Sequence, residues 1–112
     1  MEDLLKQKCV ACRADAPRVT DDELPALLKE IPEWQPITKD SVLMLNRVFK
    51  FDDYEQSLRF TQKVAALAEE EDHHPAILLE WGKVEVTWWT HKIGGLHKND
   101  FIAAAKTDTL NT

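Results

Sequence analysis

The stretch "PAILLEWGKVEVTWWTH", residues 75–91, decides the fold of this chain. Apolar, β-branched and aromatic residues dominate both sides of Gly82, which is typical of the two strands of a hairpin. Gly82-Lys83 predicts a two-residue type II′ turn, because glycine stands first. The register that follows places apolar pairs on one face, against which helices would pack. These pairs are Trp81 with Val84, Leu79 with Val86, and Ile77 with Trp88.

The same register brings two histidines together at the open end of the hairpin. His74 would lie across from His91, with Cβ atoms about 5 Å apart. Pro75 would interrupt the ladder between them, because proline has no N–H to donate. We therefore expect a notch flanked by His74 and His91, of a kind that a small ligand could enter.

The segment before the hairpin, from Asp52 to about Glu71, predicts the longest helix. Asp52 and Glu55 have the spacing of a capping box. An apolar stripe recurs at helical spacing along the segment. Its members are Tyr54, Leu58, Thr61, Ala65 and Ala68, flanked by Phe60, Val64 and Leu67.

Shorter segments complete the fold. "TDDELPALLKEI" (20–31) predicts a short helix that begins at Asp21 or Asp22. "EWQPI" (33–37) and "SVLMLNRVFKF" (41–51) predict two strands, and "GGLHKNDFIAAAKTDTL" (94–110) predicts a closing helix with Asp100 in its first turn. The order of elements predicts an α+β fold, a four-stranded antiparallel sheet with three helices packed on one face. We expect an N-terminal arm at residues 1–19 and a single domain over 20–112.

Composition excludes some classes of function. The chain has 112 residues and a net charge of −6, which disfavours binding to nucleic acid. Its start lacks the pattern of a signal peptide and no apolar run reaches membrane length, so we expect no membrane association and a cytoplasmic location. Cys9 and Cys12 could be half of a zinc site, a redox pair or two reduced thiols. The last reading is favoured, because no second C-x-x-C exists to complete a zinc site and the pair stands in a polar N-terminal tail, where a redox motif is not expected.

Histidines supply the most specific functional signal. The ordinary pKa of histidine, about 6.5, lets it give or take a proton near neutrality. Glu69 stands four residues before His73, so on a continuing helix its carboxylate could orient that imidazole. Taken singly, Glu69 could belong to a solvated face, His91 to the surface, and Asp100 to a helix end. Metal binding is disfavoured, because adjacent histidines diverge in extended backbone and the spacing matches no recognised zinc pattern.

The spacing of these residues resembles a family signature, that of the pterin-4a-carbinolamine dehydratases, some of which also act as the dimerisation cofactor of a homeodomain transcription factor. The segments "IPEWQP", "RVFKFDDYEQSLRFTQKVAALAEEEDHHP" and "KNDFIAAA" resemble the family too, so the likeness covers about residues 20–106, and the first 19 residues resemble the extension of bacterial members. The signature residues are Glu69, His73, His74, Pro75, Trp81, His91 and Asp100.

The resemblance implies an activity and a role for each site residue. The reaction would be dehydration of 4a-hydroxytetrahydropterin to quinonoid dihydropterin, which recycles the cofactor of aromatic amino-acid hydroxylases. His73 and His91 would be the acid/base pair, His74 would also bind the pterin, and Glu69 and Asp100 would support them. Thr90 and Trp34 match positions near the substrate. His97, at the expected helix cap, receives no role.

The resemblance also implies partners and leaves alternatives open. It implies no metal and no cofactor besides the pterin substrate, and an assembly of two or four copies. Two other functions fit the same signature: a binding module that acts as a coactivator for a protein partner, and a pterin-binding protein in another pathway.

Overall fold

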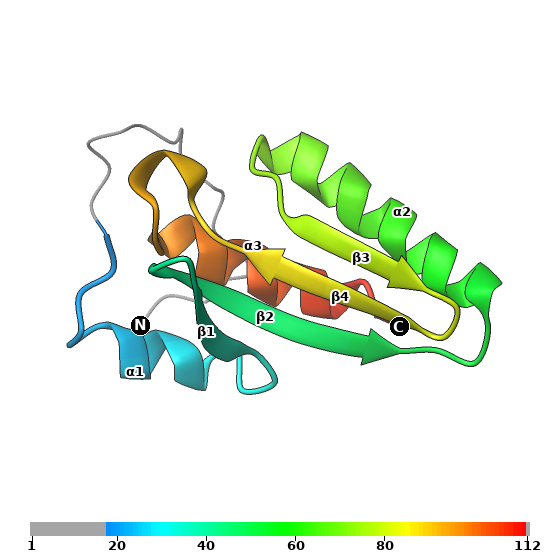
Figure 1. The fold of residues 1–112 in the computed structure, drawn as a ribbon, viewed down its shortest axis with the longest axis horizontal. Coiled ribbons are helices and arrows are strands. Elements are labelled where there is room, and N and C mark those ends of the chain that lie inside the picture. Colours follow the sequence, from blue (N-terminus) through cyan, green and yellow to red (C-terminus); the bar gives the residue numbers. More distant parts are fainter. Residues whose placement is uncertain (1–17, 112) are drawn as a thin grey trace.

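A four-stranded antiparallel sheet forms the centre of the molecule. The structure is a computed structural model that describes residues 18–111. The strands are β1 (Gln35–Lys39), β2 (Val42–Lys50), β3 (Ala76–Glu80) and β4 (Lys83–Trp88), and they lie in the order β1-β2-β4-β3 (Figure 1). The pairs β1–β2 and β3–β4 are hairpins. Strands β2 and β4 are neighbours in the sheet, although a helix and β3 separate them in the sequence.

Three helices cover one face of this sheet. They are α1 (Leu24–Lys29), α2 (Tyr54–Glu71) and α3 (Lys98–Thr109). Helix α2 packs on β3 and β4, and α3 packs on β2 and β4. Figure 1 shows the helices behind the sheet and the opposite face uncovered. The predicted α+β fold is therefore confirmed.

The core lies between the sheet and the helices. The inward residues of β2 and β4 meet apolar side chains from all three helices, which removes both sets from water and supplies the main stabilisation of the fold. Aromatic rings concentrate at the centre, where Phe49 packs on Phe60 at 4.5 Å between ring centroids. Side chains that are fully buried include Ile31, Leu45, Phe49, Val64, Val84, Val86, Trp88 and Phe101.

Helix α2 has a different cap and a different buried stripe from those predicted. Asp53 is the N-cap residue, because its carboxylate accepts a hydrogen bond from the backbone N–H of Gln56 at 2.8 Å. The predicted pair Asp52 and Glu55 was therefore one residue too early. Tyr54 and Leu58 remain exposed. The residues of α2 that face the core are Ser57, Phe60, Val64 and Ala68.

The β3–β4 hairpin is shifted by two residues from the predicted register. Leu79 pairs with Val84 and Glu80 with Lys83, so the loop residues are Trp81 and Gly82. Gly82 does not adopt the positive φ of a type II′ turn. It lies instead against the end of β2, where an added Cβ would stand 3.1 Å from the Phe51 carbonyl oxygen. A shift of two leaves the side chains within the strands on their predicted faces, which is why alternation could not reveal it. Trp81 is the exception, because it was predicted to pair with Val84 but lies in the loop and is 67% exposed.

The predicted pairing of His74 with His91 is consequently wrong. Strand β3 begins at Ala76, directly after Pro75, and β4 ends at Trp88. His91 opens a short 3₁₀ helix, His91–Ile93, beyond the ladder. The interruption expected at Pro75 is confirmed, but the two histidines are related by the loop after β4 and not by strand pairing.

Residues 18 and 19 contact the loop before α3. Helix α1 begins at Leu24, later than predicted, although Thr20 and Glu23 do form the capping-box hydrogen bonds in the preceding turn. Val19 N donates to Leu96 O at 2.9 Å, and Arg18 donates to the Ile93 carbonyl. Cys9, Cys12 and most of the predicted arm lie outside the described residues.

Candidate active site

A sharp reversal at the end of α2 places His73. Asp72 adopts a left-handed conformation (φ 51°, ψ 42°), which ends the helix. The N–H of His73 then donates back to Ala68 O at 3.1 Å, in the pattern of a Schellman motif. This turn directs the His73 side chain inward, where only 4% of it is exposed. His74, one residue later, points outward and is 54% exposed.

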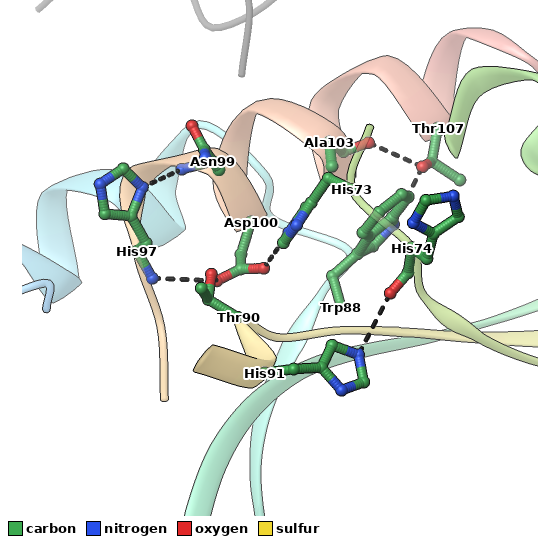
Figure 2. A network of polar contacts seen from close by, with 10 residues as sticks. All are labelled: His73, His74, Trp88, Thr90, His91, His97, Asn99, Asp100, Ala103 and Thr107. Atoms are coloured by element: carbon green, nitrogen blue, oxygen red, sulfur yellow. Dashed lines mark hydrogen bonds and ion pairs between the residues drawn. The ribbon is translucent and has the colours of Figure 1, made fainter. Parts of the chain in front are cut away.

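The buried His73 ring is held between an aromatic ring and a carboxylate. It stacks on Trp88 at 5.4 Å between centroids, with 19° between the planes. Its Nε2 lies 2.7 Å from Oδ1 of Asp100, which is fully buried (Figure 2). Both residues come from segments far apart in the chain, so the contact exists only in the folded state. Trp88 could not be assigned to this site from the sequence, because strand alternation marks it only as a core residue.

Asp100 gathers three donors at the start of α3. Besides His73, its Oδ2 accepts from the Thr90 hydroxyl at 2.8 Å and from the backbone N–H of His97 at 2.9 Å. The carboxylate also stands in the first turn of α3, where the helix dipole favours negative charge. These contacts compensate for the cost of burying the carboxylate.

Thr90 is fixed by the loop that follows β4. Its N–H donates to Gly95 O at 2.8 Å, which closes the loop as an isolated bridge. Gly94 at the tip needs glycine, because its φ is +59°. The Thr90 hydroxyl donates to Asp100, and the residue is buried. The predicted contact of Thr90 with substrate remains a prediction.

His91 and His74 form a second, exposed group. Nε2 of His91 lies 3.3 Å from the backbone carbonyl oxygen of His74, and its ring is 4.3 Å from that of Trp89. Nε2 of His74 lies 3.5 Å from a carboxylate oxygen of Glu69. Glu69 thus pairs with His74 and not, as expected, with His73, because α2 ends at Glu71 instead of continuing.

The three histidines therefore form two groups, with His73 buried and with His74 and His91 exposed. Figure 2 shows His73 pointing toward α3 and Asp100, while His74 and His91 lie away from this pair. The predicted notch flanked by His74 and His91 remains a prediction. A groove of about 600 Å³ lies on the uncovered face of the sheet, with Trp89, the ring partner of His91, among the residues that line it.

Trp34 lies in the core, at the other end of α3. Its Nε1 donates to Asp108 Oδ1 at 2.8 Å, and Arg47 contacts the same oxygen at 2.7 Å. Burial raises the pKa of Asp108 above its ordinary value, while the Trp34 and Arg47 contacts act in the opposite direction. Eight residues of helix separate Asp108 from Asp100, about 12 Å along the axis. The geometry explains Trp34 by packing, and its place among substrate-binding residues remains a prediction.

The described residues contain neither a cluster of metal ligands nor a membrane-spanning helix. Within 18–111, no three histidine, cysteine, aspartate or glutamate side chains converge closely enough to hold a metal ion. None of the helices in this part of the chain combines the length and the apolar character needed to cross a bilayer.

Comparison with known proteins gives one consistent answer. The family model described as pterin 4 alpha carbinolamine dehydratase matches residues 17–110. A Marinobacter nauticus protein is 64% identical over 98% of this chain and 99% of its own length, and a Nitrosococcus oceani protein is 59% identical over 98% and 97%. Both are named, provisionally, as pterin-4-alpha-carbinolamine dehydratases.

Two solved structures are also similar to this chain. A crystal structure of a transcriptional coactivator/pterin dehydratase from Brucella melitensis has a TM-score of 0.77 and 30% identity, covering 86% of this chain and all of that one. A pterin dehydratase-like protein, identified as a RuBisCO assembly factor in the alpha-carboxysome, has a TM-score of 0.60 and 29% identity, covering 70% and 89%. With the family model matching nearly the whole described chain, the protein belongs to the pterin 4 alpha carbinolamine dehydratase family.

Proposed function

We propose that this protein dehydrates 4a-hydroxytetrahydropterin to quinonoid dihydropterin and so recycles the pterin cofactor of aromatic amino-acid hydroxylases. The observation that carries the proposal is the family match over residues 17–110, together with relatives about 60% identical over nearly their whole length. The buried imidazole–carboxylate pair of His73 and Asp100 supports it, because such a pair serves proton transfer more readily than it serves packing alone.

The reaction needs one base and one acid on neighbouring atoms. The base removes the proton from N5 of the pterin, and the acid protonates the 4a-hydroxyl as it leaves. The C4a–O bond breaks, a C4a=N5 double bond forms, and water departs. No electrons are exchanged with another molecule, so general acid–base catalysis can serve the whole step and typically contributes about 10²–10⁴-fold in rate.

We assign these two roles to His73 and His91. A carboxylate that accepts the Nε2 proton of His73 fixes its neutral tautomer, so that Nδ1 is the basic atom. Asp100 also stabilises the ring when it is protonated, which is the state of a base after it has reacted. His91 is exposed beside the carbonyl of His74, so substrate can reach it directly. In the proposal His73 acts as the inner partner and His91 as the outer one.

His74 and Glu69 would hold the pterin at the surface. The His74 ring is half-exposed and lies within reach of the Glu69 carboxylate, which leaves it accessible to a ligand. The exposed Leu78 and the neighbouring groove on the uncovered sheet face are consistent with the expected assembly of two or four copies. We therefore propose a homo-oligomer, although the reaction as assigned uses residues of one chain.

The test is a stopped-flow assay of dehydration with purified protein. His91→Ala and His73→Gln should each lower kcat by about 10²-fold or more. Glutamine is chosen at position 73 because its amide can still donate to Asp100 and keep the fold. Arg59→Ala is the control, since this exposed residue pairs with Glu55 on the outer side of α2. If both histidine variants dehydrate the pterin as fast as the parent, the assignment is wrong.

Two further measurements separate the alternatives. Rates that survive treatment with a chelator would agree with a proton-transfer mechanism that uses no metal. A protein without measurable dehydration, but with a pterin or protein partner bound, would instead favour the binding function. That second function is named because one structural relative is described as an assembly factor and another as a coactivator/dehydratase.

A further inference from the structure

His97 occupies the N-cap of α3 and touches the site twice. Its backbone N–H donates to Oδ2 of Asp100 at 2.9 Å. Its side-chain Nδ1 accepts a hydrogen bond from the N–H of Asn99 at 3.0 Å. The residue is buried, with 9% of it exposed. No role was predicted for His97 from the sequence, yet its backbone N–H is one of the three donors on the carboxylate that holds His73.

The cap works only while the imidazole is neutral. Nδ1 can accept the Asn99 N–H only if it carries no proton, so the cap requires the Nε2–H tautomer. Protonation would place an N–H on Nδ1, facing the N–H of Asn99. Two donors repel each other, and a positive ring also opposes the positive end of the helix dipole. A protonated His97 must therefore leave its cap position.

Loss of this cap would disturb Asp100 directly. The carboxylate and the cap residue are joined by the His97 N–H to Oδ2 bond and by the backbone bond from Asp100 N to His97 O at 3.0 Å. If the His97 side chain leaves the cap, the Asn99 N–H loses its acceptor and the first turn of α3 loosens. The His97 backbone N–H that donates to Oδ2 then loses its fixed position. The Oδ1 contact with His73, 2.7 Å on the other side of the same carboxylate, would shift with it.

We propose that His97 is a positioning residue which, in its neutral form, fixes Asp100 and through it the orientation of His73. Protonation of His97 then switches off the inner half of the acid/base pair. The inference rests on the proposed dehydratase function for its catalytic meaning, but the coupling of His97 to His73 can be measured without any activity.

Charges around His97 come from three sides. Arg18 and the α1 cap residue Glu23 line a cavity of about 480 Å³ beside it, together with Lys98 of α3. Asp100 and His73 lie on its other side. Burial lowers the pKa of His97 below its ordinary value, the charge of Asp100 acts against this, and that of His73 adds to it. The ring is therefore neutral at pH 7, in the state that the cap needs.

The experiment follows the histidine ring resonances by NMR across pH in the parent, His97→Ser and His97→Ala. Serine can accept the same backbone N–H but does not titrate. In the parent, the His73 signals should inflect at the pH at which His97 titrates, below about 6.5. His97→Ser should abolish that inflection. His97→Ala should displace the His73 signals even at pH 8, because the cap is absent at every pH.

Kinetics add the catalytic readout. His97→Ala should lower kcat at pH 8 about ten-fold, because a shifted His73 misplaces the proton-transfer atom. His97→Ser should recover most of this loss. In its pH profile, the decrease of kcat at acid pH that coincides with His97 titration in the parent should be absent. The matched control is Asp53→Ala, which removes the side-chain cap of α2 instead and should change neither the His73 signals nor the pH profile.

Each outcome decides the question. His73 signals that pass through the His97 titration without an inflection, or that are unmoved in His97→Ala, would overturn the inference. A pH profile of His97→Ser that matches the parent would overturn it as well. If no variant and no parent dehydrates pterins, the proposed function fails, and the NMR coupling alone decides the positioning role.

Discussion

Asp100→Asn is the most informative single change, because it keeps the shape of the buried carboxylate and removes its charge. In the native site three donors converge on Asp100: Nε2 of His73, the Thr90 hydroxyl and the His97 N–H. Asparagine offers one oxygen and one NH₂ group. If the oxygen keeps the position of Oδ2, the NH₂ faces Nε2 of His73, and that ring must switch to its other neutral tautomer.

The cost in stability follows from these contacts. A hydrogen bond to a charged group contributes about 1.5–3 kcal/mol and a neutral one about 0.5–1.5 kcal/mol, so two bonds that lose their charge cost about 2 kcal/mol together. Rearranging the third costs about 1 kcal/mol, while relief from burying a charge offsets a similar amount. We expect the free energy of unfolding to fall by about 2 kcal/mol, equivalent to about 8 °C in Tm.

Alanine would be a poorer choice at this position. It would leave three buried donors without an acceptor, at about 1–3 kcal/mol each. That sum approaches the whole stability of a small domain, about 5–15 kcal/mol, so a loss of activity could reflect unfolding alone.

The assays are urea denaturation for stability and stopped-flow dehydration for rate. Asp100→Asn should stay folded and lose about 10²-fold or more in kcat, because the proton-accepting atom of His73 is changed. Asp108→Asn is the matched control. It neutralises another hydrogen-bonded carboxylate of α3, held by Trp34 and Arg47, and should lower stability without lowering kcat. An Asp100→Asn protein with parental kcat, or one no less stable than the parent, would refute the reasoning.

Two other outcomes follow from the structure. Trp34→Phe should lower the free energy of unfolding by about 2 kcal/mol in urea denaturation, since it deletes the donor to Asp108 and leaves a small cavity; unchanged stability would contradict the core role of the indole. Burial lowers the pKa of His97 in the folded protein, so as pH falls the unfolded chain binds a proton at His97 before the folded protein does. The stabilisation by neutral His97 is therefore complete above about pH 6.5 and is lost as the pH falls below that value. Urea midpoints at pH 7.5 and 5.5 should therefore differ more for the parent than for His97→Ser, and equal differences would contradict this.

Much of the architecture could be predicted from local sequence. The order of helices and strands, the long helix before His73 and the place of Asp100 in the first turn of α3 all follow from periodicity and capping patterns. The two faces of the β3–β4 hairpin were also predicted, although its register was not. Alternation has a period of two, so a shift of two residues is invisible to it, and the packing of Gly82 on Phe51 settles the choice.

The distance between site residues along the chain did not predict which of them lie together in the folded protein. His73 and His74 are adjacent, yet one is buried against Trp88 and the other is exposed beside Glu69. The left-handed turn at Asp72 makes this separation, and a helical pattern continued past Glu71 would have paired Glu69 with the wrong ring. The starts of α1 and α2 were misplaced by a residue or more for a different reason, since several acidic residues in each segment could serve as the cap.

The sequence by itself determined which residues could do proton chemistry and the α+β fold that carries them. Only the tertiary structure decided that His73 shares a carboxylate with Thr90 and His97, because 27 residues separate His73 from Asp100 and no local pattern encodes that distance. The contact forms where the end of α2, the loop after β4 and the start of α3 meet beside the core. Burial there removes competing water, so each donor must find a protein acceptor, and Asp100 is the acceptor they share.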